Sequence, residues 1–308
     1  MILIGLAGCY QPINIDLPQG QEQVVVNTTL TPDSTFNISL VRTNDILKSD
    51  MPKSILEADV SVFEAGELIA QLTLPNVGES GEQDFPVFKH DSRKPISGGT
   101  YELQIDIENA ETIKASTTIP ENVRLSNVEI DELMRWPDFQ ERDFDNIVIR
   151  GRLLIDNTES GDYYYHFAHA QLSLDWYDVI AGDTLVTDVN RDSILLPIEN
   201  IEIGNPSYTS LLHEPGFLIF DKDEGGIYNV VPFKITTRIN HNHQLLNHLK
   251  VLIRHTSKDY YKFHQSVTNQ LIAKENAFAE PVRPHSNIEN GQGHFSGYST
   301  SSIVHKFR

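Results

Sequence analysis

Short runs in which apolar and polar residues alternate constrain the fold of this chain more than any other feature. In residues 101–107 every odd position is apolar and every even position is polar, and Phe36, Ile38 and Leu40 repeat the pattern. Successive side chains of a β-strand point to opposite faces, so this period of two predicts half-buried strands. Similar runs occur at 24–27, 60–63, 68–74, 85–88 and 113–119. About seven short strands within about a hundred residues predict an antiparallel β-sandwich of the immunoglobulin-like or transthyretin-like kind, over residues 22–120.

The second half is also rich in expected strands, but less regular. Apolar runs at 128–130, 147–155, 163–175, 217–220, 230–239 and 249–255 indicate strands, whereas 178–206 is acidic and typical of a loop. Residues 120–122, Pro-Glu-Asn, have the composition of a linker. At 308 residues the chain is long enough for two domains, so we expect a second β-rich domain over 123–308. One large β-domain is the alternative.

One helix is expected in this second domain. Ser257 can accept a hydrogen bond from a first-turn amide as an N-cap, and Asp259 suits the positive end of the helix dipole. Tyr260, Val267 and Leu271 then follow at helical spacing. The pattern predicts a helix from about Lys258 to Ala273, packed on the second sheet.

The N-terminus suggests where the protein resides. Leu6-Ala7-Gly8-Cys9 follows a short apolar run, and Cys9 is the only cysteine. This motif resembles the bacterial lipobox, in which the cysteine is acylated and the preceding residues are removed. Residues 1–8 are too short to span a bilayer and instead fit the remnant of a signal peptide, although no Lys or Arg precedes Arg42. We therefore expect a lipid anchor at Cys9 and a tether over 9–21.

Charge and cysteine content exclude one class of partner and one kind of cross-link. Asp and Glu number 43 against 24 Lys and Arg, a formal charge of -19. Binding to a phosphate backbone depends on Lys and Arg, so nucleic acid is not an expected partner. A single cysteine excludes an intrachain disulfide.

Familiar catalytic and metal motifs do not fit. Gly297-Tyr298-Ser299-Thr300-Ser301 lacks the last glycine of a serine-hydrolase elbow and precedes no helix. His213-Glu214 runs into Pro215-Gly216, which cannot continue the helix of a zinc protease. The sequence therefore predicts a non-enzymatic protein without a cofactor.

Three polar clusters are interpreted as structural. No carboxylate or cysteine within the segment completes a metal site with His241, His243 and His248, so a polar turn between two strands is expected. Asp221, Asp223 and Glu224 open like a calcium loop, but Pro232 stands where the bidentate Glu is needed. Calcium binding by the acidic residues Asp175, Asp178, Asp183, Asp188 and Asp192 is left open, and we expect no metal ligand.

Clustered aromatic residues are the remaining candidates for ligand binding. Aromatic rings stack on sugars and are common in protein interfaces, although half of those in a strand should face the core. The candidate residues are Tyr163, Tyr164, Tyr165, Trp176 and Tyr177.

The C-terminal stretch carries a resemblance to a known family. Asp259-Tyr260-Tyr261 is followed by Phe278-Ala279-Glu280-Pro281 and then by Ser-Asn-Ile-Glu-Asn-Gly-Gln-Gly-His-Phe-Ser-Gly-Tyr-Ser over 286–299. These segments resemble the closing signature of the domain of unknown function 4249 family of Bacteroidota lipoproteins. His294 departs from the family pattern, in which Ile is common. We interpret the signature as structural and expect Ile288, Phe295 and Tyr298 to fill the core of the second domain.

The resemblance implies a lipoprotein encoded beside a TonB-dependent receptor, and no catalytic residues. The expected function is therefore that of an outer-membrane lipoprotein that assists such a receptor in nutrient capture or uptake. Tyr10 replaces the Asp that favours retention in the inner membrane, while the membrane face stays open. A stand-alone glycan- or peptide-binding surface module is the alternative, and a hydrolase with an unrecognised site is a lesser one.

Overall fold

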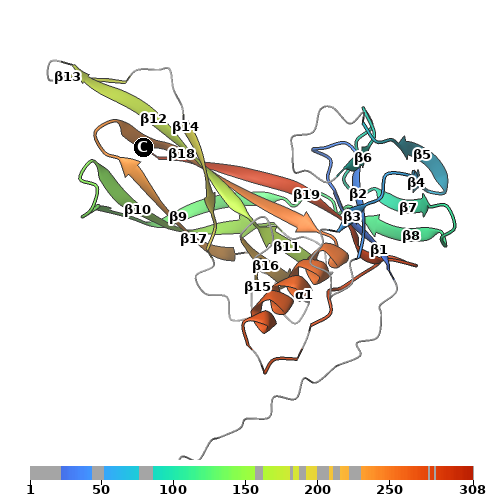
Figure 1. The fold of residues 1–308 in the computed structure, drawn as a ribbon. Coiled ribbons are helices and arrows are strands. Elements are labelled where there is room, and N and C mark those ends of the chain that lie inside the picture. The colour runs from blue at the N-terminus through green and yellow to red at the C-terminus, as the bar shows by residue number, and fades with distance from the viewer. Residues whose placement is uncertain are drawn as a thin grey trace, which may run out of the picture.

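In a computed structural model of the protein, most of the described residues lie in β-strands (Figure 1). The described ranges are 22–43, 52–75, 86–156, 162–180, 183–186, 192–199, 208–210, 216–221, 230–276, 278–280 and 282–307. Cys9, the expected signal segment 1–8 and the tether 9–21 lie outside them. The expected mainly-β fold with one C-terminal helix is confirmed.

The first unit consists of two sheets that enclose one core. The strands are β1 (Val24–Leu30), β2 (Asn37–Arg42), β3 (Lys53–Ser54), β4 (Asp59–Glu64), β5 (Glu67–Leu72), β6 (Val87–Lys89), β7 (Thr100–Asp106) and β8 (Ile113–Thr118). One sheet has the order β5-β4-β7-β8, and the other contains β1, β2, β3 and β6. Alternation is strict in β8, where buried and exposed residues alternate along the whole strand. The buried side chains of both sheets meet in one hydrophobic cluster, as the period-two pattern predicts.

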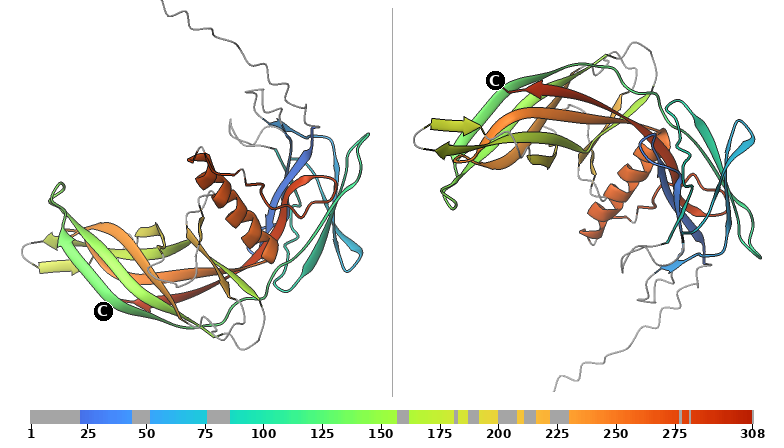
Figure 2. Two further views of the ribbon diagram at one scale, coloured as in Figure 1. Left: turned by 90° about the horizontal axis from the view of Figure 1, so that it is seen from below. Right: turned by 90° about the horizontal axis from the view of Figure 1, so that it is seen from above.

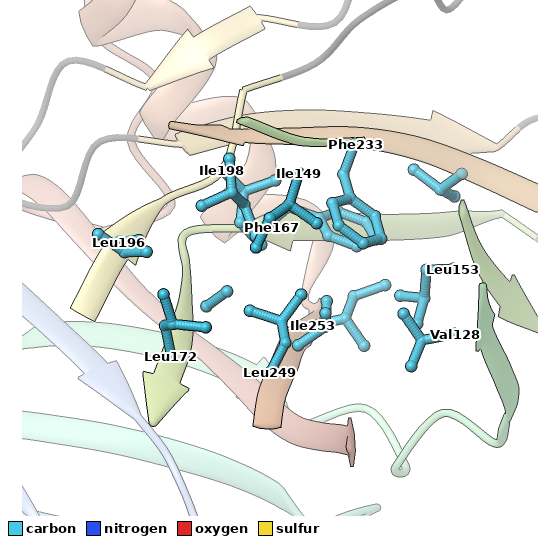
Figure 3. Close-up of a cluster of buried hydrophobic side chains, with 14 of the residues drawn as sticks. Val128, Ile149, Leu153, Phe167, Leu172, Leu196, Ile198, Phe233, Leu249 and Ile253 are labelled. Atoms are coloured by element: carbon cyan, nitrogen blue, oxygen red, sulfur yellow. The ribbon is translucent and has the colours of Figure 1, made fainter. Parts of the chain in front are cut away.

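The second unit packs two groups of strands around a second core. Its strands are β9 (Leu125–Pro137), β10 (Phe144–Ile155), β11 (Tyr163–Phe167), β12 (His169–Ile180), β13 (Asp183–Val186), β14 (Asp192–Pro197), β15 (Tyr208–Ser210), β16 (Gly216–Asp221), β17 (Val230–Asn240) and β18 (Gln244–Thr256). The sheet β17-β10-β9 faces β11, β12 and β18. Figure 3 shows the side chains of this core, among them Ile149, Phe167 and Phe233, packed between the strands.

The described residues of the stretch 178–206 form strands where the composition predicts a loop. β12 extends to Ile180, and β13 and β14 both pair with it. Leu196 and Ile198 lie buried in the core. Pairing with the edge of β12 and the burial of these two side chains account for the difference.

The last strand, β19 (Gln292–Lys306), belongs to both units. Its first residues, Gln292–Gly297, run parallel to β1, and Tyr298–Lys306 pair antiparallel with β18. In Figure 1 this strand runs from β1 on the right to the far end of the second unit on the left. The chain therefore returns to its first unit near its end, and the two units share a strand.

This return corrects one expectation. Ile288 and Phe295 pack in the core of the first unit rather than the second, because β19 enters the sheet beside β1. Tyr298 packs against the cluster beneath the helix. The signature does lock the fold, but by joining the two units.

The expected helix is confirmed as α1 (Lys258–Lys274). The Ser257 hydroxyl accepts from the amide of Tyr260 at 3.3 Å, and Asp259 lies in the first turn. Figure 2 shows α1 in the angle between the two units, where it packs against β19, β11 and β15. Within the described ranges no helix has both the length and the apolar character needed to cross a bilayer.

Candidate functional site

A cluster of tyrosine and histidine side chains lies between α1 and the sheet. We call it the helix cluster; its members are Tyr164, His166, Tyr260, Tyr261, His264 and His294. Tyr164 stacks on Phe220 with ring centroids 4.8 Å apart, and Tyr260 stacks on His264 at 4.2 Å. The outer face of β11 is thereby covered by the helix.

His166 is the most deeply buried polar residue of the helix cluster. It points away from the main core because its neighbours Tyr165 and Phe167 face that core. Its Nδ1 lies 2.8 Å from the hydroxyl of Tyr260, while its Nε2 has no hydrogen-bond partner. Burial, together with the nearby Arg254, His264 and His169, holds the pKa of His166 well below its usual range, so the ring is neutral at pH 7.

His294 is the second buried imidazole. Its ring stacks on Phe263 with centroids 3.9 Å apart, and its Nε2 lies 3.1 Å from the Thr29 hydroxyl of β1. Burial, with smaller contributions from His264 and His285, lowers its pKa to about 3. This histidine therefore ties β19, α1 and β1 together in its neutral form.

A pocket opens beside His166, where the two units meet. We call it the junction pocket; its volume is about 190 Å³. The second unit supplies His166, Ala168 and His169 from β11 and β12, Leu252 and Arg254 from β18, and Tyr298 and Thr300 from β19. The first unit supplies Asp33, from the turn after β1.

Strand register brings these distant residues together. Arg254 pairs with His166 of β11 on one side and with Thr300 of β19 on the other, so the three form one row across the sheet. The guanidinium of Arg254 lies 4.4 Å from the centre of the Tyr298 ring, a cation–π contact that orients it. The residues that line the pocket thus include Arg254, the buried neutral His166 and the exposed Asp33.

The aromatic residues expected to bind ligand do not form one surface. Tyr165 is fully buried in the main core, and Tyr164 is buried beneath α1. Tyr163 is partly buried and stacks on Tyr165. One face of β11, which carries Tyr165, turns toward the main core, and α1 covers the opposite face, which carries Tyr164. Neither tyrosine can therefore belong to a surface patch.

Trp176 and Tyr177 lie at the other end of the second unit and stay partly exposed. The Trp176 ring stacks on His243 at 6.3 Å, and the Tyr177 hydroxyl donates to the carbonyl of His241 at 2.5 Å. His241–His243 form the turn between β17 and β18, as the sequence predicts, whereas His248 lies within β18, 3.0 Å from the Ser173 hydroxyl.

The other sequence candidates have structural roles or lie outside the described residues. Ser299 lies in a strand and donates to the carbonyl of Glu121, so it is not on an elbow. Among the described residues no group of three or more His, Cys, Asp or Glu side chains gathers into a metal site. Of the acidic residues considered for calcium, Asp175 accepts from Asn247 at 2.7 Å, while the described part of the structure does not include the other side chains or the loop from 222 to 229.

Sequence reasoning missed the junction pocket. Its charged residues, Asp33 and Arg254, are far apart in the chain and follow no motif. His166 directly follows the tyrosine run but carries no signal of its own. Only the pairing of β11, β18 and β19 brings the three together.

Comparison with known proteins gives one positive result. The family model described as Domain of unknown function (DUF4249) matches residues 10–303, nearly the whole chain. No curated protein matches the sequence.

Proposed function

Because the chain belongs to the DUF4249 family, we propose that it is an outer-membrane lipoprotein that assists a TonB-dependent receptor in nutrient capture or uptake. It is anchored through acyl chains on Cys9 and catalyses no reaction itself. The observation that carries this proposal is Leu6-Ala7-Gly8-Cys9, placed a short tether before the first strand at Val24. Two or more acyl chains hold a protein stably at a bilayer.

Exposed aromatic side chains at the far end of the second unit support a role in partner contact. Phe139, in the turn after β9, is 93 % exposed, and Trp136 is 39 % exposed. The turn after β9 is hydrogen-bonded to the turn after β17, since the amide of His241 donates to the carbonyl of Asp143 at 3.0 Å. We call Trp136, Phe139, Trp176 and Tyr177 the distal tip. Apolar groups exposed together favour a protein interface.

Co-purification tests this function. The full chain is solubilised with detergent from outer membranes of its own bacterium, and the proteins recovered with it are identified by mass spectrometry. We expect a TonB-dependent receptor in stoichiometric amount, and its loss with Phe139→Ala. Leu56→Ala, at an exposed apolar residue of the first unit, is the matched control and should retain the receptor. Recovery of the protein with no barrel partner would contradict the proposal.

A second function, binding of glycans or peptides without a receptor, is favoured by Trp176 alone. Its indole is partly exposed and held by His243, an arrangement suited to stacking on a sugar ring or a peptide side chain. Binding on glycan and peptide arrays that is lost with Trp176→Ala and kept with Trp136→Ala supports it. Arrays without a hit would exclude it in favour of the receptor partnership.

A further inference from the structure

The end of α1 exposes two large apolar side chains to solvent. Ile272, in the last turn of the helix, is 55 % exposed, and Phe278, in the turn that follows, is 96 % exposed. Their exposed charged neighbours are two basic and two acidic residues. We call the whole region the helix tip; its members are Ile272, Lys274, Glu275, Phe278, Glu280 and Arg283. An aromatic ring left almost wholly in water would gain free energy from an apolar environment, so the helix tip is a candidate contact surface.

The chain that returns from the helix tip packs against α1 and supports it. The amide of His285 donates to the hydroxyl of Ser266 at 2.8 Å. The Nε2 of the same histidine lies 2.8 Å from the carboxylate of Asp259, in the first turn of α1. At 1.5 Å per residue, Lys274 lies about 12 Å beyond Ser266 along the helix axis. The apolar side chains are therefore carried on a supported projection.

Contacts along α1 show which end of the molecule the helix tip occupies. Ser257, at the start of the helix, accepts from the amide of Gly297, which pairs with the last residue of β1. Further along the helix, Phe263 stacks on His294, which pairs with the middle of β1. The helix therefore runs back along β1 toward the residue at which that strand begins. Figure 1 shows α1 and the turn after it on the lower side of the molecule, the side on which β1 starts.

The proposed anchor brings a bilayer within reach of this side. Val24, the first residue of β1, follows Cys9 by 15 positions, and a chain of that length spans at most roughly 50 Å. The 17 residues of α1 make a helix about 26 Å long. Because α1 points toward the end at which the chain from Cys9 enters β1, the helix tip lies on the side that the anchor holds near the bilayer.

The composition of the helix tip suits the boundary between lipid headgroups and acyl chains. Phenylalanine and aliphatic side chains insert into this boundary, while charged neighbours remain at the level of the headgroups. Lys274 and Arg283 are balanced by Glu275 and Glu280. The helix tip therefore has no net formal charge, and its contact with a bilayer needs no anionic lipid.

We propose that the helix tip inserts Phe278 and Ile272 into the headgroup boundary of the bilayer that carries the anchor. This inference rests on the proposed lipid anchor at Cys9 and gives α1 a second role besides covering β11. Two points of attachment fix the orientation of the two units on the membrane, which one tether alone leaves free.

Fluorescence quenching by brominated lipid tests the proposal. The full chain is coupled through Cys9, its only cysteine, to a maleimide lipid in phosphatidylcholine vesicles, so the anchor is present whether or not the native protein is acylated. Phe278→Trp places an indole at the helix tip. Leu68→Trp, at a 57 % exposed position of β5, is the matched control, because β5 lies away from the helix tip in Figure 1. The unsubstituted protein gives the background from Trp136 and Trp176.

We expect the emission of Phe278→Trp to shift to shorter wavelength on coupling and to lose intensity when the lipid is brominated, while Leu68→Trp shows neither change. No loss of intensity in Phe278→Trp, or an equal loss in Leu68→Trp, would overturn the proposal. A wavelength shift that requires membranes containing the receptor would also overturn it, because the helix tip would then contact a protein. An unmodified Cys9 in the native protein would contradict the lipid anchor instead, so the two failures are distinguishable.

Discussion

Replacing His294 with Ile should reduce the loss of stability of this protein in acid. His294 is 6 % exposed, and its pKa is about 3 in the folded protein against 6.5 for the unperturbed side chain. Between these two pH values the unfolded chain binds a proton that the folded chain does not. Stability therefore falls as the pH drops through this window. Above pH 7 His294 contributes almost nothing to the pH dependence of stability.

The magnitude follows from the two pKa values. Within the window the slope is about 1.4 kcal/mol per pH unit for one proton. Because the unfolded chain is protonated only below about pH 6.5, His294 should lower the free energy of unfolding by about 2 kcal/mol between pH 7 and pH 5. His294→Ile should lose about 2 kcal/mol less over the same interval, since Ile does not titrate.

The assay is urea denaturation at a series of pH values, followed by tryptophan fluorescence. Thr29→Val is the matched control, because it removes the hydrogen bond to His294 Nε2 but keeps the imidazole. It should lower stability at every pH without changing the slope. If wild type and His294→Ile lose the same free energy between pH 7 and pH 5, the assignment of a neutral buried histidine is wrong.

Two further substitutions test how β19 is held. Gly293 has φ +100°, and a Cβ there would collide with the carbonyl oxygen of Val26, so Gly293→Ala should cost about 3 kcal/mol or more in urea unfolding. Gly66→Ala shares the positive φ, +79°, but meets no atom within 4 Å and should cost only about 1 kcal/mol. Ser257 caps α1 and also accepts from the amide of Gly297 of β19 at 3.2 Å, so Ser257→Ala should cost about 2 kcal/mol. A thermal melt in which Ser257→Ala equals wild type would refute this double role.

The sequence predicts elements whose signal is local. Alternation along residues 101–107 and the cap at Ser257 determine β7 and α1 without reference to the rest of the chain. These elements appear close to their expected bounds. The alternation in the first half also predicts which side chains are buried, because it too is a local signal.

Elements and sites that depend on distant pairing were not predicted. The stretch that forms β19 is rich in Gly and Ser and has no regular alternation, so only its neighbours β1 and β18 make it a strand. Tyr164 looks exposed until α1, almost a hundred residues later, covers it. The junction pocket has the same origin, since its row from His166 to Thr300 exists only in the assembled sheet.

Mass spectrometry of the protein purified from its own bacterium tests the membrane-anchored function most directly. We predict a mature chain that begins at Cys9 and carries acyl groups, with residues 1–8 removed. An unmodified Cys9 still preceded by Gly8 would contradict the lipoprotein assignment and the receptor partnership built on it.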